Sequence, residues 1–438
     1  MIEHRTLRVA LLGAGSVGSQ VARLLLDNTD ELSERAGARL ELAGIAVRDV
    51  NAPRDVELPQ ELLTTDAHEL IVGADIVIEL MGGIEPARTH IIEALQSGAD
   101  VVTGNKALLA SHGAEIFDAA DQVGASVSYE ASVAAAIPIL RPLKDSLAGD
   151  HVRRIFGIVN GTTNYILDRM DREGADFDVV LADAQALGYA EADPTADVEG
   201  HDAAQKAAIL ASLAFHTNVP LEAVHCEGIA SIDAAAIENA KNAGYVIKLL
   251  ATCEQLPGEG ADGEAISVRV YPALVDREHP LASVRGGNNA VYVEAAAAGP
   301  LMFYGAGAGG RETASAILGD VVSAARRHIA GGVGIGESAR GDRPVAPIGR
   351  ITTRYQITLD VADKQGVLAT VANILSDGGV SIARLEQTIA EDETGANRAR
   401  LVIGTHRARE QALSDTVETL AASDVVVRVV TVLRVEGE

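Results

Sequence analysis

Short apolar runs alternate with longer helix-forming segments through the first third of the chain. The runs at residues 7–12, 40–47, 75–80 and 100–103 predict buried strands. The segments between them lack helix breakers and predict helices, for example at 86–96 and 107–123. Strands that alternate with helices are typical of a parallel sheet covered on both faces. The pattern therefore predicts an α/β fold, with a doubly wound sheet in a first domain at residues 1–141.

The pattern changes after Pro142, where we place a second, α+β domain at residues 142–330. Its expected strands lie at 152–159, 265–272 and 290–294, and its expected helices at 201–214, 234–253 and 313–328. We expect the last of these helices to return to the first domain. Glycines, prolines and mixed charges at 331–351 predict a linker. The segment 352–438 has the order βαββαβ, which is the ferredoxin-like motif and suggests regulation or assembly.

A glycine-rich loop follows the first strand. Gly13, Gly15 and Gly18 fit the pattern G-x-G-x-x-G between a strand and a helix, which is typical of dinucleotide binding in a Rossmann-type sheet. The second strand ends at Arg48, where an NAD site would prefer an acid. This favours NADP, with NAD still possible, whereas the alternative for Arg48 is a solvent-facing loop residue.

Acidic residues crowd around a single lysine in the stretch 188–206. Asp202 and Lys206 stand four residues apart on one face of a predicted helix, and Glu191 comes from the preceding loop. Such a group could bind a small zwitterion and transfer a proton at one of its oxygens. Acid–lysine pairs at this spacing are, however, usually solvated helix surface. Lys106 follows the strand 100–103, at the sheet edge where doubly wound folds bind ligands, although a solvated lysine is equally compatible.

Composition narrows the classes of partner. The 438 residues include 36 Lys and Arg against 62 Asp and Glu, a net charge of −26, which argues against nucleic acid or an anionic membrane. Cys226 and Cys253 are too few for a disulfide framework or a cysteine zinc site. No apolar stretch reaches the roughly 18 residues of a membrane helix, and no signal peptide is evident. We expect a soluble, cytoplasmic protein with a small-molecule substrate.

The run from Ala184 to Lys206, AQALGYAEADPTADVEGHDAAQK, resembles the signature of the homoserine dehydrogenase family. NGTTNYIL at 160–167, GNKALLA at 104–110, and GAGG with TASA at 307–316 resemble the other sequence blocks of that family, in the same order. The similarity covers essentially residues 5–330. The C-terminal segment is similar to the ACT domain that many bacterial members carry.

The resemblance implies reversible, NAD(P)H-dependent reduction of L-aspartate 4-semialdehyde to L-homoserine, on the route to threonine and methionine. By matching positions, Lys206 is the expected acid/base and Lys106 is expected at the junction of nicotinamide and substrate. Glu191 and Asp202 are expected to bind the polar groups of the substrate. The expected coenzyme contacts also include Val17, Gly188 and Gly307.

The family resemblance also implies a monovalent cation, usually sodium, and an effector. The expected cation positions are Glu130, Val133, Ala135 and Ile137. The family's glycine-rich turn is Ala134–Ala136 here, so binding should suffer if the turn needs a glycine-only dihedral. We expect a homodimer or homotetramer with threonine bound near Asp363–Gly366. Removal of the chain after about Arg350 is then expected to abolish threonine inhibition and spare activity.

Two rival functions remain open at this point. One is another NAD(P)-dependent oxidoreductase for an aspartate-derived compound, which the long central signature disfavours. The other is a non-catalytic amino-acid sensor on a dehydrogenase scaffold. The intact set of glycines at 13–18 with Lys106, Glu191, Asp202 and Lys206 disfavours the sensor, because a sensor has no need of all these residues.

Overall fold

The computed structural model describes residues 5–54, 56–258, 264–331, 341, 343–391 and 397–437. The chain forms two compact units, each assembled from three separate segments. Unit 1 comprises Met1–Gly161, Asp202–Val224 and Gly287–Arg343. Unit 2 comprises Thr162–His201, His225–Gly286 and Pro344–Glu438. Each unit therefore combines residues from more than one of the four ranges that we predicted as domains and linker.

Unit 1 contains a six-stranded sheet in the order β3-β2-β1-β4-β5-β6, in which every neighbouring pair is parallel. The strands are β1 Thr6–Leu12, β2 Arg39–Ala46, β3 Leu63–Thr64, β4 Ile76–Glu79, β5 Asp100–Thr103 and β6 Val127–Ser128. This strand order is that of a Rossmann fold. The predicted fold class is confirmed, because these apolar strands are buried on both faces as a helix-covered parallel sheet requires.

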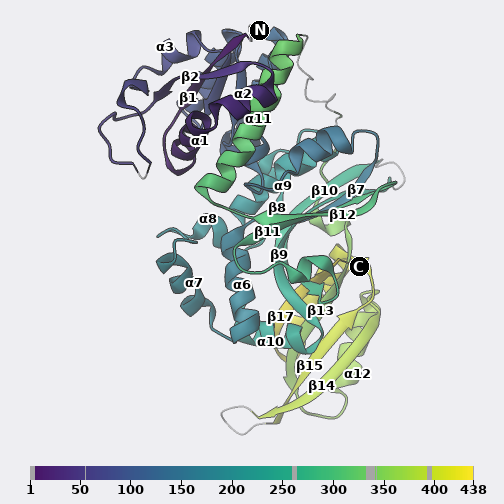
Figure 1. Ribbon diagram of the computed structural model, residues 1–438. Helices are drawn as coiled ribbons and strands as arrows, with labels where there is room; N and C mark the ends of the chain where they lie inside the picture. Colours follow the sequence, from purple (N-terminus) through teal and green to yellow (C-terminus); the bar gives the residue numbers. More distant parts are fainter. Residues whose placement is uncertain are drawn as a thin grey trace. The chain divides into compact units, whose positions relative to one another are not determined.

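Helices cover this sheet. They are α1 Ser16–Asp27, α2 Thr29–Ala36, α3 Ala67–Val72, α4 Ala87–Gln96, α5 Lys106–Val123 and α11 Gly310–Ala330. The last of them comes from far along the chain and lies beside α1 and α2 (Figure 1). Ile317 and Val321 of α11 are fully buried in the same core as Leu7 and Val21. The burial of these side chains holds the distant helix against the sheet.

Three antiparallel strands also belong to unit 1, in the order β12-β11-β7. They are β7 Val152–Ile158, β11 Asn288–Ala295 and β12 Gly299–Ala306. Strand β12 ends at Ala306, directly before the glycines of the GAGG block. Helix α9, His201–Ala214, matches its predicted bounds, and all of it except His201 lies in unit 1.

Unit 2 contains the strands β9-β10-β17-β13-β15-β14 in that order. They are β9 Tyr245–Leu256, β10 Ala265–Asp276, β13 Thr352–Ala362, β14 Ile382–Glu391, β15 Asn397–Thr405 and β17 Val426–Glu436, with the short strands β8 His225–Cys226 and β16 Ala408–Arg409 beside β10 and β13. Its helices are α6 Gly161–Glu173, α7 Phe177–Ala186, α8 Thr195–Val198, α10 Ala234–Asn242, α12 Val367–Asp377 and α13 Glu410–Ala421.

The predicted helix at 234–253 is wrong in its second half. Helix α10 ends at Asn242, and Gly244, with φ +88°, begins the turn into β9. Strand β9 pairs residue by residue with β10, and residues 246–253 are all buried. A strand buried on both faces shows a continuous apolar run, which has no period to distinguish it from a buried helix.

The C-terminal segment has the predicted order β13-α12-β14-β15-α13-β17, apart from the two-residue β16. It has a core of its own, which includes Ile357, Leu359, Val371 and Leu401. It is nevertheless not separate from the rest of unit 2, because β17 pairs with β13 on one side and with β10 on the other. The end of the chain is thus part of the same sheet as residues 245–276.

Candidate active site

The glycine loop after β1 has the geometry of a dinucleotide site. A Cβ atom on Gly13, whose φ is +99°, would lie 2.6 Å from the carbonyl oxygen of Leu80, and one on Gly18 would lie 2.1 Å from the carbonyl oxygen of Gly13. Gly15 instead faces open space and caps α1 without a side-chain hydrogen bond. The first N–H groups of α1 therefore remain available to a pyrophosphate. The residues fit a dinucleotide coenzyme.

A pocket of about 310 Å³ lies beside this loop. It is lined by Ala14, Gly15, Ser16, Ser19, Gln20, Pro53, Arg54, Val56, Gly310 and Arg311. Arg54 is held in place because its guanidinium donates to the carbonyl oxygens of Asp49 (2.7 Å) and Ala52 (2.9 Å). These partners are neutral, so the positive charge stays available to a phosphate. Arg48, the predicted coenzyme residue, is exposed and does not line this pocket. No motif in the sequence had pointed to Arg54 or Arg311.

The rim of the parallel sheet is organised by a buried acid. Glu79, fully buried at the end of β4, accepts hydrogen bonds from the Met81 N–H (2.7 Å) and the Thr103 hydroxyl (2.7 Å). Asn105 caps α5 by accepting from the Leu108 N–H (3.2 Å). Lys106 is consequently the first residue of α5. Glu79 was not among the predicted site residues, although an acid inside the apolar run 76–80 was visible in the sequence.

Lys106, Asp202 and Lys206 meet in unit 1. The Nζ atom of Lys206 donates to Oδ2 of Asp202 (2.6 Å) and to the carbonyl oxygen of Val159 (2.6 Å). Oδ1 of Asp202 faces Nζ of Lys106 at 3.1 Å. The Asn160 amide donates to Oδ2 of Asp202 (2.9 Å). The side chains of Lys206 and Asp202 are only 11% and 12% exposed, so this pair is not a solvated surface pair.

Electrostatics keep the Asp202 carboxylate ionised. Burial opposes its ionisation, but the charges of Lys206 and Lys106 outweigh burial and hold the pKa of Asp202 well below its usual 3.8. The carboxylate therefore does not take up a proton from Lys206 at neutral pH. Two of the three Lys206 ammonium protons have acceptors among the described residues, which leaves one for a ligand.

Gly188 and Glu191 lie on a loop of unit 2. The loop is anchored by a hydrogen bond from the Thr162 hydroxyl to the Tyr189 carbonyl (2.6 Å) and by stacking of Tyr165 on Tyr189 at 4.7 Å. Gly188 has φ +77°, and the side chain of Glu191 is exposed. Because these residues belong to the other compact unit, their roles toward coenzyme and substrate stay predictions.

Gly307 lies at a close approach in unit 1. A Cβ atom there would lie 2.3 Å from Oδ1 of Asn289, so only glycine fits without a shift of that side chain. Asn289 is fully buried, and neither polar atom of its amide has a hydrogen-bond partner within the ranges that the structure covers. Nothing in the sequence pattern had pointed to Asn289.

The predicted cation positions fit a cation only in part. Both Glu130 carboxylate oxygens already accept hydrogen bonds, from the N–H groups of Ile139, Leu140 and Arg141 and from the Arg141 guanidinium. The carbonyls of Val133, Ala135 and Ile137 accept no hydrogen bond from any residue with described coordinates. These carbonyls remain available as ligands, whereas the Glu130 carboxylate is committed to the turn.

The turn next to these carbonyls is left-handed without glycine. Ala134 has φ +58° and Ala135 has φ +51°, a conformation that costs an alanine about 1 kcal/mol or more. Burial of both alanines and the engaged Glu130 carboxylate hold the turn in this state. Alanine therefore does not prevent the backbone conformation that we had associated with glycine.

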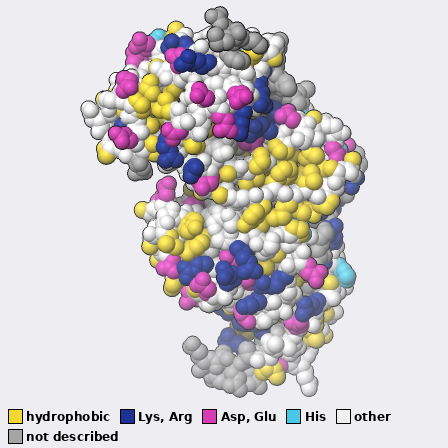
Figure 2. Space-filling view, in the orientation of Figure 1, with side chains coloured by type: hydrophobic (Ala, Val, Ile, Leu, Met, Phe, Trp, Pro, Cys, Tyr) yellow, Lys and Arg dark blue, Asp and Glu magenta, His cyan; other side chains and the backbone are white. Residues whose placement is uncertain are grey.

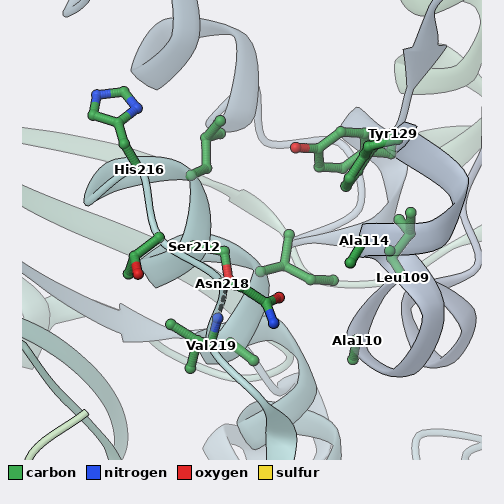
Figure 3. A pocket seen from close by; sticks show the side chains of 14 residues that line it. Leu109, Ala110, Ala114, Tyr129, Ser212, His216, Asn218 and Val219 are labelled. Atoms are coloured by element: carbon green, nitrogen blue, oxygen red, sulfur yellow. Dashed lines mark hydrogen bonds between the residues drawn. The ribbon is translucent and has the colours of Figure 1, made fainter. Parts of the chain in front are cut away.

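A second cavity lies between α5 and α9, farther along the helices that carry Lys106 and Lys206. It is lined by Leu109, Ala110 and Ala114 of α5, by Ser212 of α9 and by the following residues His216, Asn218 and Val219, among others (Figure 3). Its volume of about 60 Å³ is several times smaller than the roughly 300 Å³ of small ligand pockets. This cavity is not a substrate site.

A dinucleotide loop on a Rossmann sheet, together with a largely covered lysine–carboxylate pair, is the arrangement of a nicotinamide-dependent oxidoreductase. No helix in the described part of the chain is long and apolar enough to cross a membrane.

Comparisons with known proteins specify the family. Residues 13–130 match the family model for "Homoserine dehydrogenase, NAD binding domain", and residues 138–322 match that for "Homoserine dehydrogenase". The homoserine dehydrogenase of Corynebacterium glutamicum is 53% identical over 432 residues, which cover 98% of this chain and 96% of that protein.

Solved structures agree with the sequence matches. The homoserine dehydrogenase of Thiobacillus denitrificans superposes with a TM-score of 0.89 at 36% identity, over 99% of this chain and 98% of that chain. A hyperthermophilic archaeal homoserine dehydrogenase mutant in complex with NADPH has a TM-score of 0.61 at 25% identity, over 75% of this chain and 99% of that chain. The chain belongs to the homoserine dehydrogenase family, whose members are NAD(P)-dependent oxidoreductases acting on a CH–OH group.

Proposed function

We propose that Lys206 is the general acid/base in the reversible reduction of L-aspartate 4-semialdehyde to L-homoserine. The observation that carries this role is the position of its ammonium group, which is held between the Asp202 carboxylate and the Val159 carbonyl with one proton uncommitted. A buried ammonium beside a developing alkoxide is both a proton donor and a stabilising charge.

The remaining polar groups divide the other tasks. The reduced nicotinamide coenzyme, when bound, supplies a hydride to the substrate carbonyl carbon. As the carbonyl oxygen gains negative charge, Lys206 donates its free proton to that oxygen, and in the reverse direction it accepts the hydroxyl proton. Asp202 orients Lys206 and Lys106 through one carboxylate. Glu191 binds the substrate ammonium.

The coenzyme site uses the glycine loop and nearby cations. Gly13, Gly15, Val17 and Gly18 would hold the pyrophosphate, and Lys106, Gly188 and Gly307 would contact the nicotinamide half. Arg48 on the loop after β2, with Arg54 and Arg311 in the adjoining pocket, supports a preference for NADP, whose extra phosphate needs a cation. A measured NADPH to NADH ratio of kcat/KM below one would contradict this preference.

The proposed assembly with a second copy uses an apolar strand edge of unit 1. Hydrophobic side chains gather on the face over β11 and β12 (Figure 2). Strand β12 ends its sheet path, and its Tyr304 is 56% exposed next to half-buried Leu301, Met302 and Phe303. Such an edge favours pairing with a second copy. We propose a homodimer or homotetramer, which light scattering would contradict by a monomer mass at micromolar concentration.

The family resemblance supports threonine as the effector near Asp363–Gly366, and sodium as a structural cation at the carbonyls of Val133, Ala135 and Ile137. Threonine that leaves turnover unchanged at millimolar concentration would contradict the first. Equal thermal stability in sodium and in choline buffers would contradict the second.

The deciding experiment measures NADPH and NADH oxidation with aspartate semialdehyde by the wild type and by Lys206→Ala. We expect Lys206→Ala to lose about a hundredfold or more in kcat, as loss of a general acid predicts, while it still binds NADPH by fluorescence titration. More than a tenth of wild-type turnover in Lys206→Ala would exclude the proton-transfer role. A wild type inactive with both coenzymes would exclude the proposed reaction and favour the sensor.

A further inference from the structure

A series of ionic contacts, centred on the buried Arg269 and the largely covered Arg434, runs through unit 2 from β10 to β17. Arg269 of β10, only 2% exposed, donates to Glu254 (2.9 Å), to Glu436 of β17 (3.2 Å) and to the Tyr271 hydroxyl (2.8 Å). The Tyr271 hydroxyl donates to the same Glu436 oxygen at 2.6 Å. A buried guanidinium without its carboxylates would cost several kcal/mol, so β10 depends on Glu436, which lies close to the C-terminus.

Arg434 continues this chain on the same strand. Its guanidinium lies 4.4 Å from the centre of the Tyr271 ring and donates to Glu410 at the start of α13 (2.7 Å). Its other terminal nitrogen donates to Glu227 (2.9 Å), directly after β8. Arg434 is thus the residue through which the C-terminal segment reaches the 225–229 segment.

Glu227 is held as a carboxylate by two partners. Burial opposes its ionisation, but hydrogen bonds with His225 (2.7 Å) and Arg434 outweigh burial and lower the pKa of Glu227 to about 2. Its own N–H donates to the carbonyl oxygen of Val270 in β10 (2.8 Å). Hydrogen bonds therefore hold both the side chain and the backbone of Glu227.

The residues around Glu227 support the loop that leads into α9. The Ile229 N–H donates to the Val198 carbonyl (2.8 Å), and the Cys226 thiol donates to the Glu199 carbonyl (3.3 Å). A Cβ atom on Gly228 would lie 2.3 Å from the carbonyl oxygen of Val198, so the two backbones are in direct contact. Gly200, with φ +83°, completes the turn, and α9 begins at His201.

We infer that the Arg434–Glu227 ion pair is a positioning contact for the Asp202–Lys206 pair. The C-terminal strand holds the 225–229 segment, and that segment supports the turn at 198–200. This turn sets the first residues of α9, the helix that carries Asp202 and Lys206. The inference rests on the proposed role of Lys206. It makes activity dependent on residues at the opposite end of the sequence.

The same contacts change the expected outcome of truncation. From the sequence we expected removal of the chain after about Arg350 to spare activity. Truncation would remove β17, so β10 would lose its pairing at Ala273–Val275 and Arg269 would lose Glu436. We now expect the truncated chain to be inactive, which is why point variants of the full-length chain are the informative test.

The test is a double-mutant cycle with Glu227→Gln and Arg434→Met in the full-length enzyme. Glu227→Gln keeps the shape of the side chain and removes only its charge. Arg400→Met is the matched control, because Arg400 pairs with Asp360 within the same C-terminal segment (2.8 Å) but contacts no part of the 225–229 segment. The measurements are kcat, the KM for NADPH, urea unfolding and hydrogen exchange of residues 195–206.

We expect Glu227→Gln to lower kcat about tenfold and to leave the KM for NADPH within about twofold. Exchange at 195–206 should increase. The double variant should be no slower than Arg434→Met alone, because the two changes break one contact. Arg434→Lys should recover part of the kcat, whereas Arg400→Met should affect unfolding only.

The inference is overturned if Glu227→Gln weakens urea stability as much as Arg400→Met does and leaves kcat unchanged. Additive kcat effects of Glu227→Gln and Arg434→Met would also overturn it. If Arg434→Met fails to fold, Glu227→Gln and Glu227→Asp still decide the result. Wild-type turnover and the Lys206→Ala result are measured in parallel, so failure here is separable from failure of the proposed reaction.

Discussion

Two lysines of this chain, the largely covered Lys206 and the buried Lys248, differ in the oxygens that they face. Lys206 contacts the ionised Asp202 carboxylate at 2.6 Å and has a second carbonyl partner. Lys248 of β9 is only 2% exposed, and its ammonium donates to neutral oxygens, the Asn164 side chain (2.9 Å) and the Val284 carbonyl (2.6 Å). Burial lowers the pKa of Lys248 to about 8, although the carboxylates of Asp168 and Asp171 oppose this shift.

Burial alone therefore does not distinguish Lys206, the proposed acid, from Lys248. Lys248 lies close to a cavity of about 20 Å³, too small for a substrate, and its protons hold α6 to the 284–286 turn. Lys206 retains a free proton, a fixed negative partner and a second lysine across that partner. Lys206 therefore differs from Lys248 because one of its hydrogen-bond partners is a carboxylate, whereas the ammonium of Lys248 donates to neutral oxygens.

The largest effect is expected for Asp202→Asn. The change leaves Lys106 and Lys206 close together without their shared carboxylate, and broken buried pairs cost about 3–5 kcal/mol. We expect kcat/KM to fall by about a thousandfold, measured with saturating NADPH. The control Asp178→Asn alters an exposed acid of α7 and should leave kcat/KM unchanged. If Asp202→Asn lowers kcat/KM by less than tenfold, the charged partner does not distinguish Lys206 from Lys248.

The next effect concerns stability at alkaline pH. Because the pKa of Lys248 falls from 10.5 to about 8 on folding, the unfolded chain binds the extra proton between these pH values. Stability contributed by this group therefore rises as pH increases through that window, by roughly 3 kcal/mol in total. Urea unfolding from pH 7.5 to 10.5 should show this rise in the wild type relative to Lys248→Met.

The matched control for that series is Lys241→Met, at an exposed position of α10, which should keep the wild-type pH dependence. Turnover of Lys248→Met at pH 7.5 should stay within about threefold of the wild type. Identical pH profiles of stability for the wild type and Lys248→Met would show that Lys248 keeps an ordinary pKa in the fold.

The smallest effect is expected from two asparagines, Asn160 directly before α6 and Asn164 in its first turn. Asn160 donates to Asp202, whereas Asn164 accepts from Lys248. Loss of one hydrogen bond to a charged group is worth about 1.5–3 kcal/mol. We expect Asn160→Ala to lower kcat about tenfold with little loss of stability, and Asn164→Ala to lower urea stability with kcat nearly unchanged. The opposite assignment of effects would reverse the roles of the two lysine sites.

Local patterns in the sequence were sufficient for much of the fold and part of the site. The strand–loop–helix order around Gly13–Gly18 predicted the Rossmann sheet, and the spacing of Asp202 and Lys206 predicted their contact. Both depend on residues close in sequence, whose geometry follows from the period of one helix or strand. The alanines at 134 and 135 show the limit of this reasoning, because their left-handed turn depends on burial and on Glu130.

Other features were decided only by the tertiary structure. Lys106 contacts Asp202, which lies 96 positions later in the sequence, and Arg54 and Arg311 line the same pocket. On β17, Arg434 and Glu436 contact residues that lie more than 160 positions earlier. Residues 245–256 became a strand for the same reason, since β10 supplies their hydrogen-bond partners. The sequence by itself determined the family, the elements and the local acid–lysine spacing. The packing of the sheets decided which distant charge compensates each buried charged group, because the local sequence period carries no information about such pairs.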